Sequence, residues 1–386
     1  MKILICVTHL LGTGHLARAL TLGRAFTARG HAVTLASGGF AAPQLSTAGV
    51  DLVQLPPLRS DGVDFSRLLG QDGSLATEAY LQSRITAFTR LLHHVRPDVL
   101  ITELYPFGRR GLRREFRSLL EAAHALPRRP LVLSSIRDIL APPSKPDRAT
   151  EAEAMILARY DGVLVHSDPR ATRLEASWPV SPALAAQLHY TGYVAPASAA
   201  PHPEGIGKGE ILVSAGGGNV GDALYATAIA AAKQMPELPW RLLIGGNDAD
   251  ARIARLSDPA SPARLEPARP DFRALLPHAA ASVSLCGYNT ALDLLQSGCP
   301  SVLVPFDAGK EVEQSLRAQS LAPLPGFAVE ASASLTPDRL CAALRKVMQA
   351  PQRSLDGFEF DGAARSVEIA QTLHGEMQAN ALGRHS

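Results

Sequence analysis

Aromatic residues and excess charge are both scarce in this sequence. Phe, Trp and Tyr make up 5% of the 386 residues, and the formal net charge at pH 7 is +2. A general nucleic-acid binder carries a strongly basic face, and proteins that bind single strands add aromatic side chains on which bases stack. The composition therefore argues against nucleic acid as a partner.

Cysteines are few and widely separated, and no two of them form a CxxC pair. This spacing fits neither a zinc site nor a disulfide framework, so we expect a reducing compartment, the cytoplasm. No apolar run approaches the ~20 residues of a membrane span. No charged leader or cleavage site precedes the first apolar stretch. The four cysteines are Cys6, Cys286, Cys299 and Cys341.

Several catalytic signatures are also missing. The sequence has no HExxH, GxSxG or paired-carboxylate motif of the kind that indicates a protease, an esterase or a glycosidase. What is present is a globular composition, with 46% hydrophobic and 19% charged residues. A chain of 386 residues suits two domains, each large enough to bury its own core.

The chain opens with the pattern of a βαβ unit. Ile3–Val7 is an apolar run typical of a central parallel strand, and His31–Ala36 has the same character. Between them, Gly12-Thr13-Gly14-His15 forms a glycine-rich turn before a helical pattern. A complete GxGxxG is absent, because Arg18 stands near the third glycine position, so a dinucleotide site is not favoured.

Further βα repeats follow in both halves. A long Pro-, Gly- and Asp-rich loop at 56–73 is of the kind that serves as a lid or an acceptor-binding segment. A Pro- and Ala-rich stretch at 194–209 indicates an interdomain linker. We predict an α/β protein of two Rossmann-like domains, each with a glycine loop after its first strand. The other strands expected are 50–55, 99–102, 131–134, 162–165, 188–193, 211–214, 240–244, 282–285 and 301–304.

The block 282–318 brings polar residues to the carboxyl edge of the second sheet. A tight turn at Gly287 precedes a helix that Asn289 or Thr290 can cap, and Thr290 and Asp293 have the spacing of a capping box. A second helix is expected at 310–318. Helix N-termini at this edge attract anions, so the block predicts an anionic ligand.

Five segments together resemble those of GT-B glycosyltransferases of the MurG type, which move N-acetylglucosamine from UDP-GlcNAc onto a lipid-linked acceptor. They are closer still to a MurG-related group of predicted glycosyltransferases. The resemblance covers nearly the whole chain and implies a GT-B fold, with two facing Rossmann-like domains and a cleft between them. The segments are PFGRR (106–110), SIRDIL (135–140), YDGVLVHSDP (160–169), YTGYV (190–194) and CGYNT (286–290).

The same resemblance gives the domain limits and the site. It implies an N-terminal acceptor domain at 1–194, a donor domain at 195–362 and a last helix at 363–386 that crosses back. His15, on the GxGH loop, would be the general base. Glu103, which ends a strand at the same edge, would orient it. A plain helix-start role for His15, a structural or acceptor-binding role for Glu103, and Asp138 as the partner are the alternatives.

Donor binding is expected on the glycine loops and on the block 282–318. Tight turns and helix capping are the simpler explanations of these residues. By resemblance the loops and the helix start meet the diphosphate, Asp293 the ribose, and Glu313 and Gln314 the sugar hydroxyls. Glu313 stands where the family has Gln, and a carboxylate cannot donate to an N-acetyl oxygen. The donor-binding residues expected are Gly14, Gly216, Gly217, Gly218, Asn219, Gly287, Asn289, Thr290, Asp293, Glu313 and Gln314.

Arginines recur at three- and four-residue intervals after Glu103. On a helix they would form one basic stripe, which is either a solvated face or a surface for an anionic acceptor or an anionic membrane. The stripe comprises Arg109, Arg110, Arg113, Arg114 and Arg117.

These observations predict an inverting, metal-independent glycosyltransferase of cell-envelope or polysaccharide biosynthesis. It would move a hexose or N-acetylhexosamine from a UDP-sugar to a glycan or lipid-linked acceptor, with no further cofactor. It would be cytoplasmic, with peripheral contact at the inner face of the membrane as an added expectation. A nucleotide-sugar epimerase or hydrolase, or a non-enzymatic nucleotide-sugar binding protein, are the alternatives. UDP release distinguishes them, because only a transferase needs an acceptor.

Overall fold

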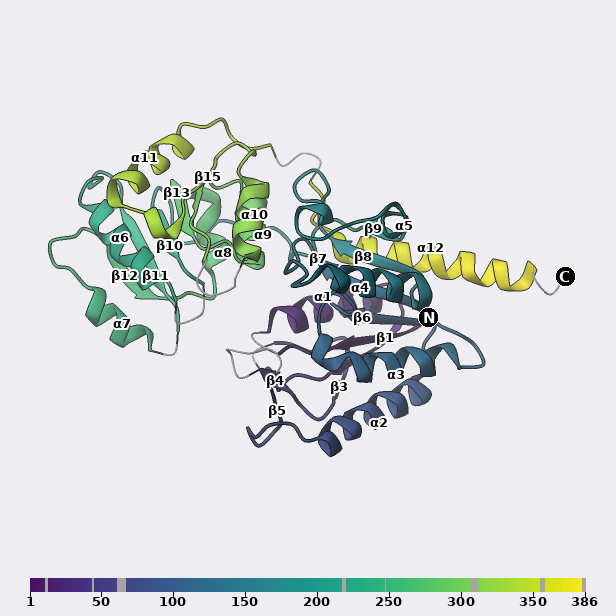
Figure 1. Ribbon diagram of the computed structural model, residues 1–386. Coiled ribbons are helices and arrows are strands. Elements are labelled where there is room, and N and C mark those ends of the chain that lie inside the picture. The colour runs from purple at the N-terminus through teal and green to yellow at the C-terminus, as the bar shows by residue number, and fades with distance from the viewer. Residues whose placement is uncertain are drawn as a thin grey trace. The chain divides into compact units, whose positions relative to one another are not determined.

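The computed structural model describes residues 1–10, 13–43, 45–60, 67–216, 220–246, 248–306, 312–354 and 358–383. The chain divides into two compact units (Figure 1). The N-terminal unit comprises 1–169, 173–194 and 359–386, and the C-terminal unit comprises 170–172 and 195–358. Four of the residues singled out in the sequence, Gly12, Gly217, Gly218 and Asn219, lie outside the described residues.

The N-terminal unit is built on a parallel sheet with the order β3-β2-β1-β6-β7-β8-β9 among the described residues. Its strands are nearly continuous apolar runs, as expected for a sheet that is covered on both faces. The strand order reverses between β1 and β6, which are direct neighbours. The strands are β1 (Lys2–Val7), β2 (Ala32–Ser37), β3 (Asp51–Gln54), β6 (Val99–Glu103), β7 (Leu131–Arg137), β8 (Gly162–His166) and β9 (Leu188–Tyr190).

Helices cover both faces of this sheet (Figure 1). On one face α2, α3 and α4 bury Phe88, Phe116 and Ile156 against the strands. On the other, α1 and α12 contribute Leu20 and Val367 to a second core. The helices are α1 (Gly14–Ala28), α2 (Glu78–Val95), α3 (Arg113–His124), α4 (Pro146–Arg159), α5 (Pro182–Ala185) and α12 (Gly362–Gly383), with 3-10 turns at Arg110–Leu112 and Leu174–Ala176.

The loop expected at 56–73 carries a small hairpin of its own. Its antiparallel strands are β4 (Arg59–Ser60) and β5 (Leu68–Leu69). Tyr80, in the first turn of α2, donates its hydroxyl hydrogen to Pro57 O at 2.8 Å and so ties the loop to that helix. The described part of this loop is therefore more ordered than its composition predicts.

The C-terminal unit repeats the doubly wound plan. Its described strands have the order β12-β11-β10-β13-β14-β15. Counted from β10, this is the order 3-2-1-4-5-6 of a Rossmann fold, with its reversal between β10 and β13. The strands are β10 (Ile211–Ser214), β11 (Trp240–Ile244), β12 (Arg264–Pro267), β13 (Ala281–Ser284), β14 (Ser301–Leu303) and β15 (Phe327–Val329).

The core of this unit lies between the sheet and helices α6 and α11. Leu224 and Leu344 are among its fully or almost fully buried side chains. The predicted α/β class with Rossmann-like sheets is confirmed by the topology of both units. The helices are α6 (Asp222–Ala232), α7 (Ala249–Leu256), α8 (Phe272–Leu275), α9 (Tyr288–Ser297), α10 (Glu313–Leu321) and α11 (Pro337–Met348), with 3-10 turns at Leu276–His278 and Ser332–Ser334.

Candidate functional site

The first part of the candidate site lies where the strand order of the N-terminal unit reverses. His15 is the second residue of α1, which follows β1, and Glu103 is the last residue of β6. Since β1 and β6 are parallel neighbours, both side chains emerge at one carboxyl edge. Ligands of open α/β sheets bind outside such a reversal.

The structure brings His15 and Glu103 into direct contact. His15 Nδ1 lies 2.9 Å from Glu103 Oε1, and the Glu103 side chain is 2% exposed. Arg18, one turn further along α1, forms an ion pair with the same oxygen. In the sequence Arg18 interrupts a glycine motif and follows the GxGH loop, as in the MurG-like families, but neither feature predicts a contact with Glu103. Its position three residues after His15 on a helix was the signal that it faces the same way.

These contacts determine which nitrogen of His15 carries the proton. The Arg18 guanidinium can only donate, and it lies 3.2 Å from His15 Nδ1 as well as against Glu103. A charge-assisted bond to the carboxylate is the stronger of the two, so Arg18 donates to Glu103. His15 Nδ1–H also donates to Glu103, which leaves the lone pair on Nε2.

Burial and the neighbouring charges fix the charge states of His15 and Glu103. Burial, helped by the charges of Arg109 and Arg18, lowers the pKa of His15 to about 3, although the bond to Glu103 opposes the shift. Arg18, His15 and Ser135 together hold the pKa of the Glu103 carboxyl far below its usual range, although burial acts against them. The imidazole is therefore neutral and the carboxylate charged at physiological pH.

Asp138, the alternative partner of His15, follows β7 and is 2% exposed. The carboxylate within hydrogen-bond distance of the His15 ring is that of Glu103. The described contacts of His15 therefore favour Glu103 as the orienting acid.

The chain turns sharply directly after Glu103. Leu104 has a left-handed backbone with φ 69°, and its N–H donates to Ser135 O at 2.8 Å. A Cβ at Gly108 would stand 2.8 Å from the Leu104 side chain, which explains why glycine occupies that position. Arg109 is also left-handed, with φ 59°.

The predicted helical stripe of arginines is wrong for its first member, Arg109. Arg109 precedes the helical segment, and its Nε donates to Thr8 O at 2.7 Å. It therefore ties the turn to the loop after β1 and is not part of a helix face. The other four lie on the 3-10 turn and α3 and are exposed, and Arg114 pairs with Glu78 of α2. The remaining stripe is Arg110, Arg113, Arg114 and Arg117.

In the C-terminal unit the strand order reverses between β10 and β13, and a glycine follows each strand. Gly216 has φ 79°, a conformation that favours glycine. Gly287 has an ordinary backbone, and no described atom lies within 4 Å of where its Cβ would be. Gly14, in the N-terminal unit, has the same open surroundings. Local packing therefore does not explain glycine at Gly14 or Gly287, and both leave room for a ligand to approach the backbone.

The predicted capping of α9 is wrong. The helix begins at Tyr288 with Gly287 as its N-cap, and no side chain caps it among the described residues. Asn289 and Thr290 lie inside the first turn instead, so they cannot take the cap position. A helix start without a side-chain cap leaves backbone N–H groups to be satisfied by solvent or by an anion.

Asp293 lies one turn into α9 and is paired with an arginine. Its Oδ1 accepts from Arg273 Nε at 2.8 Å, and Arg273 Nη2 donates to Gln296 Oε1 at 2.8 Å. The three residues line a small cavity of about 20 Å³. Burial raises the pKa of the Asp293 carboxyl, although Arg273 opposes that shift. A nucleotide ribose would have to share this carboxylate with Arg273.

Gln314, in the first turn of α10, joins the ends of two strands. Its Oε1 accepts from Cys286 N at 2.9 Å and from Phe306 N at 3.1 Å. Glu313 is the first residue of the same helix and is half-buried. The carbonyl oxygen of Gln314 is therefore bound to the backbone at the ends of β13 and β14.

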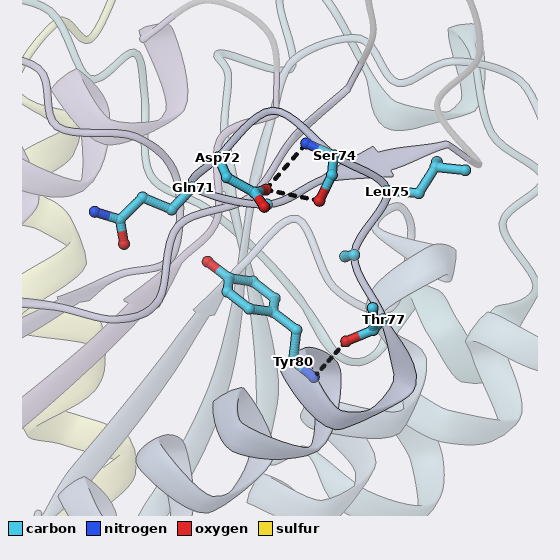
Figure 2. Close-up of a pocket in the computed structure, with 8 residues that line it drawn as sticks. Gln71, Asp72, Ser74, Leu75, Thr77 and Tyr80 are labelled. Carbon is cyan, nitrogen blue, oxygen red and sulfur yellow. Dashed lines mark hydrogen bonds between the residues drawn. The ribbon is translucent and has the colours of Figure 1, made fainter.

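A larger surface cavity, of about 510 Å³, lies between the β5 turn and the start of α2 in the N-terminal unit (Figure 2). Its polar groups bond to one another: Asp72 Oδ1 accepts from Ser74 N and Oγ, and Thr77 accepts from Tyr80 N. Gln71, Leu75, Gly70 and Ala76 complete the lining. Three of its lining residues, Gly70, Gln71 and Asp72, belong to the loop 56–73 that the sequence predicts as a lid or acceptor-binding segment.

Metal-binding clusters and membrane-spanning helices are both absent from the described residues. No group of three or more His, Cys, Asp or Glu side chains is arranged to hold a metal ion within the described ranges. No helix in the described part of the chain is both long and apolar enough to cross a bilayer.

Comparison with known proteins agrees with this geometry. Residues 232–370 match the glycosyltransferase family 28 C-terminal domain. A Brucella anthropi relative, UDP-N-acetylglucosamine–N-acetylmuramyl-(pentapeptide) pyrophosphoryl-undecaprenol N-acetylglucosamine transferase, is 32% identical over 149 residues. That match covers 36% of this chain and 38% of the relative, so the chain spans well under half of the relative's length.

Solved structures extend the likeness to the whole fold. MurG of Acinetobacter baumannii is 16% identical, with a TM-score of 0.63 over 96% of this chain and 100% of that chain. UGT2 of Phytolacca americana, solved with UDP-2-fluoro-glucose and pterostilbene, is 16% identical, with a TM-score of 0.58 over 97% and 93% of the two chains. The predicted resemblance to MurG-type proteins is thus confirmed: the chain has a GT-B fold, and its residues 232–370 match the family 28 C-terminal domain.

Proposed function

We propose that this protein is an inverting, metal-independent glycosyltransferase that moves a hexose or N-acetylhexosamine from a UDP-sugar to a glycan or lipid-linked acceptor. The observation that carries the proposal is the buried His15–Glu103 pair at the carboxyl edge of the N-terminal sheet. It supplies a neutral imidazole whose Nε2 is the proton acceptor. The family 28 domain at 232–370 supports a nucleotide-sugar donor, and the lipid-linked acceptor named for the Brucella relative supports an acceptor of that class.

In the proposed step, His15 Nε2 takes the proton of an acceptor hydroxyl while that oxygen attacks the anomeric carbon. The bond between the anomeric carbon and the diphosphate breaks, and UDP leaves with the bonding electron pair. The imidazolium that forms is stabilised by the Glu103 carboxylate, which does not itself take the proton because its pKa lies far below its usual range. Attack from the face opposite the leaving group inverts the anomeric configuration.

The departing diphosphate needs positive potential. The start of α9, which has no side-chain cap among the described residues, offers backbone N–H groups and the positive end of a helix dipole. The open space in front of Gly287 allows a phosphate to approach them. We propose that these groups do the work that a metal ion does in other transferases. Unchanged activity in excess EDTA is the expected result, and full loss would refute metal independence.

The ribose is assigned to Asp293. Asp293→Ala should weaken UDP binding by about 1.5–3 kcal/mol, because ribose hydroxyls would lose a charged acceptor. The matched control is Arg273→Met, which removes the ion-pair partner and leaves the carboxylate in place. If calorimetry gives equal UDP affinity for wild type and Asp293→Ala, the carboxylate serves only to hold Arg273.

The test of the function is acceptor-dependent UDP release from UDP-GlcNAc, UDP-glucose and UDP-galactose, with the product anomer read by NMR. His15→Ala should leave donor affinity nearly intact and lower turnover by ~10²–10⁴-fold. His31→Ala, a half-buried histidine of the same unit that contacts Gln371, is the control. UDP release without acceptor would indicate a hydrolase, and normal turnover by His15→Ala would remove the base assignment.

A further inference from the structure

Behind Glu103 a line of buried hydrogen bonds continues through the sheet. Glu103 Oε2 accepts from Ser135 Oγ at 2.6 Å, and Ser135 Oγ lies 2.9 Å from His166 Nε2. His166 Nδ1 in turn lies 2.9 Å from Thr191 Oγ1. Ser135, His166 and Thr191 are each 0% exposed. We refer to these three residues as the buried polar chain.

The buried polar chain follows the order of the strands. Glu103 ends β6, Ser135 is its register partner in β7, His166 ends β8, and Thr191 directly follows β9. With His15 after β1, five neighbouring strands each supply one polar group at the same carboxyl edge. The helices of this unit bury the strand interior on both faces, so an unbonded polar group here would cost roughly 1–3 kcal/mol.

The direction of each hydrogen bond follows from the Glu103 carboxylate, which can only accept. Ser135 has one hydroxyl hydrogen and donates it to Glu103, so its oxygen must accept from His166 Nε2–H. Burial lowers the pKa of His166 to about 3, so this imidazole is neutral and its Nδ1 is an acceptor. Thr191 Oγ1–H completes the chain, in competition with Gly192 O at 2.7 Å.

The opposite direction of hydrogen bonds along the buried polar chain would be weaker. It would place the His166 proton on Nδ1, turn the Ser135 hydrogen towards His166 and leave Glu103 Oε2 without that donor. The bond to an ionised carboxylate is roughly twice as strong as one between neutral groups. The donors therefore all point towards Glu103, and such aligned bonds polarise one another.

We propose that Ser135 and His166 are positioning residues for the base. They hold Glu103 Oε2, so that the carboxylate presents Oε1 to His15 and keeps the His15 proton on Nδ1. This inference rests on the proposed function for its catalytic consequence, but the tautomer of His15 is a property of the free protein. Without the chain only Arg18 and His15 hold the carboxylate, so its last torsion rotates more freely and the contact between Oε1 and His15 Nδ1 is less firmly fixed.

The experiment is ¹⁵N-histidine NMR of the full-length protein, without substrate, at neutral pH. Each ring nitrogen reports whether it carries a proton, and His15→Gln and His166→Gln assign the two signals among the 12 histidines. In the wild type we expect His15 protonated at Nδ1 and His166 at Nε2. In Ser135→Ala and His166→Leu we expect the His15 proton to move towards Nε2, and turnover to fall about 10- to 100-fold with the KM of the donor unchanged.

Two matched variants separate positioning from a general loss of stability. His166→Gln keeps a donor N–H towards Ser135, so it should restore the His15 tautomer and most of the turnover lost in His166→Leu. Ser134→Ala removes an equally buried hydroxyl from the same strand, one that donates to Tyr105 O at 2.8 Å and not to Glu103. It should leave the His15 signals as in the wild type.

The outcomes are distinct. An Nδ1-protonated His15 in both Ser135→Ala and His166→Leu overturns the inference, whatever the activity. A shift of the same size in Ser134→Ala also overturns it, because the effect would then be general. A wild-type protein that shows the expected tautomers but transfers no sugar contradicts the proposed function and leaves the positioning intact. If His166→Leu fails to fold, Ser135→Ala and Ser134→Ala decide the matter.

Discussion

The ion pair between Arg18 and Glu103 should be strongly coupled in its contribution to the stability of the N-terminal unit. Both side chains are almost fully buried, at 4% and 2% exposure. Glu103→Gln would leave the Arg18 guanidinium buried without a counter-charge. It would also offer one oxygen and one NH₂ group to three donors, so at least one donor would face another. Removing one partner of a buried pair costs about 3–5 kcal/mol.

The double variant should recover part of that loss. Arg18→Met alone leaves a buried carboxylate that keeps His15 and Ser135 as donors. Arg18→Met with Glu103→Gln removes both charges, so neither residue is buried as an uncompensated ion. The losses in free energy of unfolding of the two single variants, added together, should therefore exceed the loss in the double variant by about 2 kcal/mol or more. Interaction energies between contacting residues are about 0.5–3 kcal/mol.

The two tryptophans make this cycle measurable in the whole chain. Trp178 lies in the N-terminal unit and Trp240 in the C-terminal unit. In a Trp240→Phe background, urea unfolding followed by fluorescence reports only on the environment of Trp178, which is 3% exposed. All four members of the cycle share this background, so its own cost cancels. Losses that add within about 0.5 kcal/mol would refute the coupling and the assignment of Arg18 to Glu103.

Three further predictions follow from single contacts. The pKa of His166 is about 3 in the folded state and about 6.5 in the unfolded state, so between these pH values the unfolded state binds more protons and the free energy of unfolding falls as pH drops. In His166→Gln the free energy of unfolding should change with pH less steeply, by about 1.4 kcal/mol per pH unit. Equal pH dependence in wild type and variant would contradict a neutral buried His166. Gln314→Glu keeps an acceptor for both backbone N–H groups but replaces the amide donor by a charged oxygen, so the KM for the donor sugar should rise; an unchanged KM would mean that Gln314 only joins the strands. Arg113→Glu should weaken co-sedimentation with vesicles containing anionic lipid at least fivefold at low salt, whereas Lys346→Glu on α11 should not; no wild-type binding at low salt would rule out a membrane role.

The strands of the second half were predictable almost to the residue. The expected strands 211–214 and 240–244 coincide with β10 and β11, because both are short apolar runs bounded by turn residues. The edge strands β12 and β15 were missed. β12 reads Arg-Leu-Glu-Pro and is exposed at both ends, so neither apolar content nor alternation marks it.

The start of α9 shows where local rules fail. Thr290 and Asp293 have the spacing of a capping box, but the spacing does not say where the helix begins. The backbone at Gly287 is extended and the helix starts at Tyr288, which puts Thr290 two positions inside it. The error is informative, because a helix start that uses no polar side chain as its cap keeps its N–H groups accessible to a ligand.

The members of the buried polar chain were visible in the sequence but not as a group. Ser135, His166 and Thr191 lie in three of the segments that carry the family resemblance. Ser135 comes two residues before the end of β7, His166 ends β8, and Thr191 follows β9. Sequence separation hides their contact, because only the strand order places β6, β7, β8 and β9 side by side. A polar residue at the same edge of successive buried strands was the available signal.

The contacts of Glu103 and His15 assign different roles to these two residues. A carboxylate that accepted from an acceptor hydroxyl would need a free oxygen, yet Oε1 already accepts from His15 and Arg18, and Oε2 from Ser135. Three donors also make it a very weak base, because each stabilises the charged form. His15 differs in its open lone pair: its Nδ1 is bound to Glu103, while its 13% exposed side chain retains an unprotonated Nε2. The proton of an acceptor hydroxyl can therefore be taken only by the imidazole. The hydrogen bonds that hold Glu103 keep the His15 proton on Nδ1 and leave Nε2 as the acceptor.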